Sequence, residues 1–212
     1  HAGIYAFSER VMIGESETLQ MLDPISAIEI IEANRDVIVG IKVRLGKNTS
    51  GRNGIIPLEY ALRVSEKTKL PIMVHIDEAP PAYSEVLKMM RMGDILTHCF
   101  RPSPNSPINS NGEVLPEVLD ARERGVLFDV GHGMGSFCFE VTKIMMHQKF
   151  YPDTISSDIH KLCINGPAHD LLTTLSKFLN LGMPLYNVIE AATKNAAIAL
   201  NRKAIGNLKE GN

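Results

Sequence analysis

Runs of apolar, mostly β-branched residues alternate along the chain with segments of helical periodicity. The runs cover residues 37–45, 71–76, 94–100, 125–130 and 154–159, and a weaker sixth run covers residues 3–7. Continuous apolar runs are typical of parallel strands that are buried on both faces and joined by crossover helices. The pattern therefore predicts an α/β fold built on a parallel sheet.

The intervening segments have the spacing expected of amphipathic helices. The first, residues 24–34, has isoleucines on one face, Asp23 as an N-cap and Pro24 at its first position. Further helices are expected over residues 58–67, 82–92, 115–124, 139–150 and 168–181. A strict order of strand, helix, strand and helix favours a TIM-type (β/α) barrel.

Metal-competent or ionisable side chains lie near the ends of four of the predicted strands. They are Lys42, His75, His98 and Asp158. The carboxyl ends of barrel strands converge at one mouth, and histidine nitrogens and carboxylates are the expected ligands of zinc. A lone histidine here would more often be a hydrogen-bonded core residue, but two histidines with an aspartate at equivalent positions favour a metal site.

Lys42 requires an explanation of its own, because it interrupts an apolar strand. A lysine should avoid such burial unless it is paired or chemically modified. Taken alone, it could extend to solvent or bind a phosphate.

Composition narrows the classes of partner. The chain has 212 residues, 44% of them hydrophobic, and a formal net charge of -2, so it offers no basic surface for nucleic acid. Its three cysteines form no CxxC pair, and no apolar run is long enough to cross a membrane. We expect a cytoplasmic protein that binds a small molecule and neither nucleic acid nor a membrane, and that could form a homo-oligomer.

Six segments together resemble the amidohydrolase superfamily, and more closely its dihydroorotase-like branch of amidohydrolase/deacetylase metallohydrolases. The resemblance rests on their order and spacing and covers nearly the whole chain. The segments are Val39-Gly40-Ile41-Lys42-Val43-Arg44, Met73-Val74-His75-Ile76, Asp94 to Phe100, Phe128-Asp129-Val130-Gly131-His132-Gly133, Ile155-Ser156-Ser157-Asp158-Ile159 and Asn165-Gly166-Pro167.

The resemblance implies a binuclear zinc centre. Lys42 would be carboxylated by CO₂ to a carbamate that bridges two zinc ions, His75 and His98 would bind the second ion, and Asp158 would bind the first. A carbamate is an anion with two oxygens, so the two cations would stabilise it and remove the problem of a buried lysine. A bridging hydroxide would then attack the substrate carbonyl, with Asp158 as the proton shuttle.

Two further residues are candidates for substrate binding. His132, in a glycine-flanked turn, either binds substrate or stabilises its loop through a hydrogen bond. Arg44 shares a strand face with Lys42, and it either pairs with a substrate carboxylate or forms a structural salt bridge. His160 and Lys161 are expected near the mouth without a catalytic role.

The chain departs from the family pattern in one respect, because no His-x-His pair occurs in it. Barrels of this type need about 250 residues, so we expect that the first barrel strands lie upstream of this sequence. Residues 1–204 would form a partial (β/α)8 barrel, with residues 191–197 resembling its last helix. Residues 205–212 would begin an accessory β-sandwich.

These expectations favour a hydrolase of amide, cyclic amide or related ester bonds in a small molecule, with an acetylated acid as one candidate substrate. Two alternatives stay open at this point. One is a non-catalytic or single-metal barrel remnant. The other is a phosphate-binding barrel lyase or isomerase that uses Lys42 as a Schiff-base amine.

Overall fold

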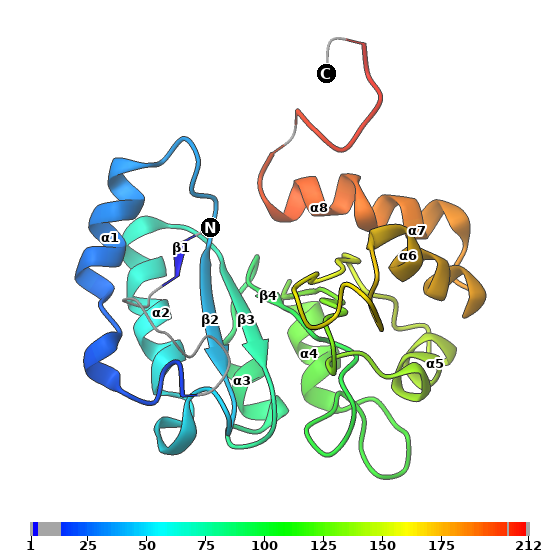
Figure 1. Ribbon diagram of the computed structural model, residues 1–212, viewed down its shortest axis with the longest axis horizontal. Coiled ribbons are helices and arrows are strands. Elements are labelled where there is room, and N and C mark those ends of the chain that lie inside the picture. Colours follow the sequence, from blue (N-terminus) through cyan, green and yellow to red (C-terminus); the bar gives the residue numbers. More distant parts are fainter. Residues whose placement is uncertain (1, 4–13, 203, 211–212) are drawn as a thin grey trace.

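Five strands form one parallel sheet in the computed structural model, which describes residues 2–3, 14–202 and 204–210. They are β1 (Ala2–Gly3), β2 (Ile41–Leu45), β3 (Ile72–Ile76), β4 (Ile95–Leu96) and β5 (Leu127–Phe128). Each strand pairs with the next one along the chain, in the order β1-β2-β3-β4-β5 (Figure 1). Sequential parallel pairing with helical crossovers is the arrangement of a (β/α) barrel wall, so the predicted fold class is confirmed as part of such a barrel.

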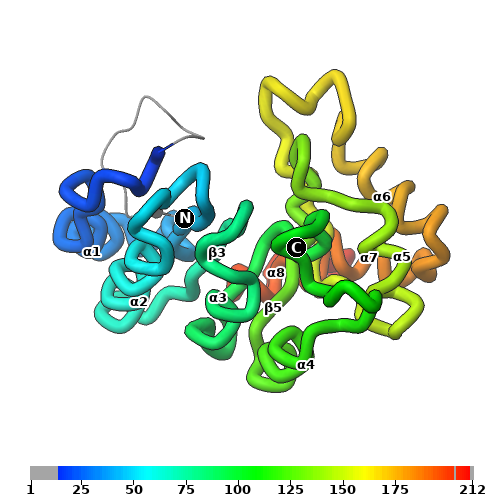
Figure 2. The backbone as a smooth tube through the Cα atoms, turned by 90° about the horizontal axis from the view of Figure 1, so that it is seen from below, coloured from blue at the N-terminus to red at the C-terminus, as the bar shows by residue number. Residues whose placement is uncertain are grey.

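Helices α1 to α4 occupy the crossovers between the five strands, and the other helices follow β5. Their bounds are α1 (Pro24–Ala33), α2 (Ile56–Thr68), α3 (Tyr83–Met89), α4 (Pro116–Glu123), α5 (Phe139–His147), α6 (Leu171–Asn180), α7 (Leu185–Ala192) and α8 (Lys194–Ala199), with short 3₁₀ helices at Leu19–Met21 and Gly51–Asn53. Helices α1 to α4 follow one another along one side of the sheet (Figure 2). The predicted cap of α1 is confirmed, because the Asp23 side chain accepts the backbone N–H groups of Ile25 and Ser26.

Alternating burial divides the two long strands into two faces. In β2, Ile41, Val43 and Leu45 are fully buried, whereas Lys42 and Arg44 are partly exposed. Strand β3 has the same pattern, and its His75 lies opposite Arg44 in the register. Because side chains alternate across a strand, one face of the sheet supplies the apolar core and the other carries the polar side chains.

The predicted strands are longer than the observed ones. The run 37–45 becomes a strand only at Ile41, because residues 34–37 form a turn in which Val37 is 65% exposed. In the run 94–100 only Ile95 and Leu96 pair, because the backbone turns at His98, where φ is +64°. The run 125–130 is likewise reduced to Leu127 and Phe128.

The fifth predicted strand, residues 154–159, is mostly irregular. Only Thr154 forms a parallel bridge, to Asp129, and the segment otherwise receives separate backbone hydrogen bonds from Val130, His132 and Gly133. The segment therefore lies beside β5 as expected but without a continuous ladder. Of the weakest prediction, residues 3–7, Gly3 lies in β1 and the rest falls outside the described residues.

The remaining differences concern helix ends and the carboxyl terminus. The helices expected to extend to residues 92 and 150 end at Met89 and His147, and α6 begins at Leu171, where Asp170 caps it by accepting the Thr173 N–H. Residues 204–210 form turns and bends, and the domain boundary expected at residue 204 stays a prediction. Over the described part of the chain, every helix is too short or too polar to cross a membrane.

Candidate active site

A cavity of about 380 Å³ lies at the carboxyl ends of the strands. It is lined by all four residues predicted as metal ligands: Lys42, His75, His98 and Asp158. Lys42 lies in β2 and His75 in β3, whereas His98 follows β4 and Asp158 lies in the irregular segment 154–159. Arg44, His160 and Lys161 also line it, as does the loop of residues 134–136. The convergence expected from barrel topology is therefore present.

The two histidine rings meet edge to face in this cavity. The distance between His75 Nδ1 and His98 Nε2 is 2.7 Å, and the rings are inclined at 86°. Burial lowers the pKa of both imidazoles well below its usual value, with the positive charges of nearby Lys42 and Arg44 adding to this effect. Both rings are therefore neutral near pH 7.

The outer nitrogens of the same two rings have partners of their own. His98 Nδ1 lies 2.6 Å from the carbonyl oxygen of Gly131, which can only accept, so this nitrogen carries the proton. His75 Nε2 faces the Asp77 carboxylate at 3.9 Å. His98 Nε2 is then an acceptor, so His75 Nδ1 donates the 2.7 Å hydrogen bond between the rings. A metal ion could replace this shared proton and bind both inner nitrogens, with the His75 proton then on Nε2, towards Asp77. The pair therefore fits a metal ion, since metal-binding histidines are usually oriented in this way by a carboxylate or carbonyl.

A third ligand has to come from a different kind of residue. Among the residues that the structure describes, no three His, Cys, Asp or Glu side chains lie close enough together to hold a metal ion. Lys42 lines the same cavity, and burial lowers the pKa of its amine to about 8, against the opposing charges of Asp129 and Asp158. A lower pKa increases the fraction of neutral amine, which is the form that can react with CO₂.

Asp158 lies in a tight turn on the cavity wall. Its φ is +47°, a left-handed conformation that costs a non-glycine residue about 1–3 kcal/mol and is most frequent at functional sites. His98 shares this feature with a φ of +64°. Partial burial raises the pKa of the Asp158 carboxyl, whereas the charge of Lys42 opposes the increase.

Arg44 has an acidic partner within the chain. Its Nε lies 2.9 Å from a carboxylate oxygen of Glu15, and both side chains are largely buried. The salt bridge considered for Arg44 therefore exists, although the side chain also lines the cavity. Burial raises the pKa of Glu15, while Arg44 and Lys42 oppose this.

His132 is buried and does not line the cavity. Its Nδ1 lies 2.9 Å from the Gly133 carbonyl, its Nε2 lies 2.7 Å from Lys177 Nζ on α6, and its ring stacks on Phe137 at 4.6 Å. Both ring nitrogens thus have partners in the fold, which favours the loop-stabilising interpretation.

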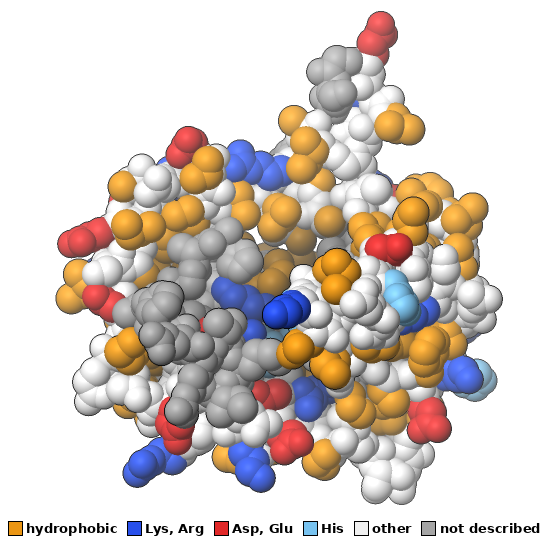
Figure 3. Space-filling model, in the orientation of Figure 1, with side chains coloured by type: hydrophobic (Ala, Val, Ile, Leu, Met, Phe, Trp, Pro, Cys, Tyr) orange, Lys and Arg blue, Asp and Glu red, His pale blue; other side chains and the backbone are white. Residues whose placement is uncertain are grey.

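Basic groups outnumber acidic ones on the cavity wall. Lys42, Arg44, His160 and Lys161 line it together with the single carboxylate of Asp158. Lys and Arg side chains gather near the centre of the face shown in Figure 3. The expected position of His160 and Lys161 near the mouth is confirmed, and His147 and His169 are exposed elsewhere.

Sequence reasoning passed over three residues beside the site. Asp129 follows a strand just as His98 does, so its position offered the same signal as the predicted ligands. Asp77 lies two residues after His75, a spacing that could have marked it as a partner. Glu15 precedes the first helix, and no sequence pattern indicates that it pairs with Arg44.

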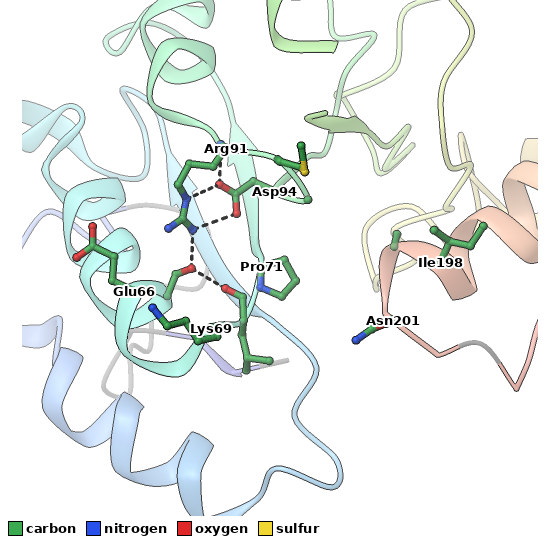
Figure 4. A pocket seen from close by; sticks show the side chains of 12 residues that line it. Glu66, Lys69, Pro71, Arg91, Asp94, Ile198 and Asn201 are labelled. Atoms are coloured by element: carbon green, nitrogen blue, oxygen red, sulfur yellow. Dashed lines mark hydrogen bonds and ion pairs between the residues drawn. The ribbon is translucent and has the colours of Figure 1, made fainter. Parts of the chain in front are cut away.

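A second cavity, of about 530 Å³, lies at the amino ends of the strands. In it, Arg91 donates to both carboxylate oxygens of Asp94 and to Ser65 Oγ (Figure 4). Asp94 also accepts the backbone N–H of Ile72. The side chains of Ile198 and Asn201 lie across the cavity from this cluster (Figure 4). The buried carboxylate of Asp94 is thus satisfied by donors within the cluster.

A parallel sheet with sequential strands, helical crossovers and ionisable side chains at the carboxyl ends of its strands defines the class of (β/α)-barrel proteins. No protein-family model matches the chain. A Brucella anthropi protein named deacetylase is 35% identical to it over 199 residues, which is 92% of this chain and 50% of that relative. This chain thus spans about half the length of the curated relatives that it matches.

Solved structures show the same likeness. A crystal structure of an adenine deaminase matches this chain with a TM-score of 0.93 and 33% sequence identity. The match covers 99% of this chain and 57% of the deaminase chain. A crystal structure of a dihydroorotase matches with a TM-score of 0.85 and 32% sequence identity, over 96% of this chain and 55% of the dihydroorotase chain. The chain belongs to the amidohydrolase superfamily, as its strand-end motifs predicted.

Proposed function

We propose that this chain carries most of the active site of a metal-dependent hydrolase, which cleaves an amide, cyclic amide or related ester bond in a small molecule. One observation carries the proposal: the inner nitrogens of His75 and His98 face each other in a cavity that Lys42 and Asp158 also line. The names of similar proteins, deacetylase, adenine deaminase and dihydroorotase, support hydrolysis at a carbon that bears nitrogen or oxygen.

His75 and His98 would hold one zinc ion, with a carbamate on Lys42 as the third protein ligand. The other oxygen of the carbamate, together with Asp158, would hold a second ion. Bound zinc would lower the pKa of a water molecule and polarise the scissile carbonyl.

Asp158 is the group that would move the proton. It lines the cavity and is exposed to solvent, and partial burial raises the pKa of its carboxyl, which makes it a better proton acceptor than an ordinary aspartate. We propose that it takes the proton of the attacking water and delivers it to the leaving nitrogen or oxygen.

The substrate that we propose is an anion. With Lys42 converted to a carbamate, the positive charge that would attract a carboxylate comes from Arg44, Lys161 and the bound zinc, and Lys161 and His160 lie at the exposed side of the cavity. Arg44 would contribute its charge from a fixed position, because Glu15 holds its guanidinium. An acetylated amino or hydroxy acid would combine such a carboxylate with a cleavable acyl group.

Metal analysis of three variants tests the metal site. We expect the wild-type protein to retain zinc after desalting, and His75→Ala and His98→Ala to lose it. His147→Ala, which removes an exposed histidine of α5, should retain the metal. Equal zinc content in the wild type and in both cavity variants would refute the site.

The modification of Lys42 is tested by ¹³C NMR after exchange with ¹³C-bicarbonate. A carbamate carbon should be visible in the zinc-loaded wild type and absent from Lys42→Arg. Lys161→Arg, which changes another lysine of the same cavity, should keep the signal. A signal that persists in Lys42→Arg would place the carbamate elsewhere.

A further inference from the structure

A buried carboxylate that the proposed metal site does not use lies directly behind it. Asp129 follows β5 and is only 2% exposed. Its Oδ2 accepts hydrogen bonds from Thr97 Oγ1 at 2.7 Å and Ser156 Oγ at 2.8 Å, and its Oδ1 accepts one from Thr154 Oγ1 at 2.7 Å. Burial of a charge is costly unless hydrogen bonds compensate for it, and here three hydroxyl groups from the neighbouring segments on both sides do so.

One of these hydroxyl groups leads to a metal-site histidine. Because a carboxylate can only accept, Ser156 must donate its single hydroxyl proton to Asp129. Its oxygen then accepts the backbone N–H of Gly131 at 3.2 Å, and the carbonyl of Gly131 accepts the proton of His98 Nδ1 at 2.6 Å. The carboxylate thus holds Ser156, Ser156 holds the Gly131 backbone in place, and the Gly131 carbonyl sets the tautomer of His98.

The geometry of Gly131 keeps this chain short. Its φ is +47°, and a Cβ at this position would lie 2.1 Å from Thr97 Oγ1 and 2.9 Å from His98 Nδ1. Only a glycine allows the backbone to approach the histidine so closely in this conformation. Thr97, the residue before His98, is bound to the same carboxylate, so Asp129 restrains His98 along two routes.

We propose that Asp129 is a positioning residue, which acts through Ser156 and Gly131 to hold His98 in the tautomer and orientation that present Nε2 to the metal. This inference rests on the proposed function, because it takes His98 as a metal ligand. Groups that bond directly to a metal ligand, as the Gly131 carbonyl does here, typically contribute about 10- to 100-fold to metal affinity, and displacing Gly131 through Ser156 or Asp129 should cost up to that amount.

Thr154 provides a matched comparison for Ser156. Both donate a hydroxyl hydrogen bond to the same carboxylate at nearly the same distance, 2.7 Å and 2.8 Å. Only the Ser156 oxygen also binds Gly131. If Asp129 acts by positioning His98, loss of the Ser156 hydroxyl must affect His98, whereas loss of the Thr154 hydroxyl must affect mainly stability.

The experiment compares Ser156→Ala, Ser156→Thr, Thr154→Val and Asp129→Asn with the wild-type protein. One readout is the ¹⁵N NMR spectrum of the imidazoles in the metal-free protein, in which His98→Ala assigns the His98 signals. The other is the dissociation constant for Co²⁺, measured from its visible absorption. We expect the wild type to have the His98 proton on Nδ1 only.

In Ser156→Ala and Asp129→Asn, both tautomers of His98 should be populated, and Co²⁺ should bind about 10- to 100-fold more weakly. Ser156→Thr should restore both properties. In Thr154→Val the tautomer should be unchanged, and affinity should fall by less than about threefold. If Asp129→Asn does not fold, the pair of Ser156→Ala and Thr154→Val decides the question.

Wild-type behaviour of Ser156→Ala in both readouts would overturn the proposal, as would an equal loss of affinity in Thr154→Val. A wild-type protein that binds no Co²⁺ would instead refute the proposed function. The tautomer of His98 in the metal-free variants would then still show whether Asp129 orders this ring.

Discussion

The two cavities at opposite ends of the same strands differ in how their polar groups are satisfied. At the amino end, Arg91, Asp94 and Ser65 form a cluster in which donors and acceptors match. At the carboxyl end, the inner nitrogens of His75 and His98 contact each other, and Lys42 and Asp158 line the same cavity. The first arrangement is complete within the chain, whereas the proposed function adds a metal ion to the second, so stability is assigned to one end and chemistry to the other.

The largest effect on stability is expected at the amino end. Asp94→Ala removes the acceptor of the Ile72 and Arg91 backbone N–H groups and of the Arg91 side chain. Leaving such donors unpaired should lower the free energy of unfolding by about 2–4 kcal/mol, as measured by urea denaturation. Zinc affinity of the folded protein should not change. A loss of zinc affinity without a loss of stability would contradict the division between the two ends.

The next largest effect is expected from Gly131→Ala at the carboxyl end. The new Cβ would collide with Thr97 and with the His98 ring at a backbone conformation unfavourable for alanine. We expect a loss of about 1–3 kcal/mol in stability and at least about tenfold in zinc affinity. Gly54→Ala is the matched control, because Gly54 has a similar φ of +50° and nothing lies within 4 Å of its Cβ position. Calorimetric zinc titration distinguishes the two variants, and equal affinities would contradict the role of His98.

A smaller effect on stability is expected from Gly133→Ala. Its Cβ would lie 2.7 Å from Asp158 Oδ2, and the flexible carboxylate can move away. Stability should fall by about 1 kcal/mol because of the positive φ, whereas kcat should fall more than zinc affinity because Asp158 is displaced. If kcat were unchanged although the Asp158 carboxylate had moved, Asp158 would not be the group that carries the proton.

The smallest effect is expected from Glu66→Gln, at the rim of the amino-end cavity. Glu66 is exposed and lines this cavity. A surface substitution of this kind should change the free energy of unfolding by no more than about 0.5 kcal/mol. A larger loss of stability, with zinc affinity intact, would show that the amino-end cluster extends to its rim.

The sequence predicted which side chains converge in the cavity more accurately than it predicted the lengths of the strands that carry them. The convergence of Lys42, His75, His98 and Asp158 follows from barrel topology, which brings strand ends together whatever the detailed strand lengths. The strand lengths themselves were overestimated, because apolar runs continue into turns. The left-handed turn at His98 interrupts one of these runs, and residue composition does not reveal it.

The partners of the predicted residues could be foreseen only in part. The hydrogen bond from His98 to the Gly131 carbonyl depends on a backbone conformation at Gly131, and the pairing of Arg44 with Glu15 joins segments that no local pattern relates. Asp129 could have been singled out by its strand-end position. Its three hydroxyl partners come from two different segments, so the sequence alone does not show that they meet.

Anomalous diffraction from a crystal of the zinc-loaded protein tests the central claim most directly. We expect a zinc peak between the rings, about 2.0–2.1 Å from both His75 Nδ1 and His98 Nε2. Two such bonds at a tetrahedral angle require the nitrogens to separate from 2.7 Å to roughly 3.3 Å. A fully loaded crystal with no peak at this position, or with its zinc bound only outside the carboxyl-end cavity, would contradict the claim that these histidines form a metal centre.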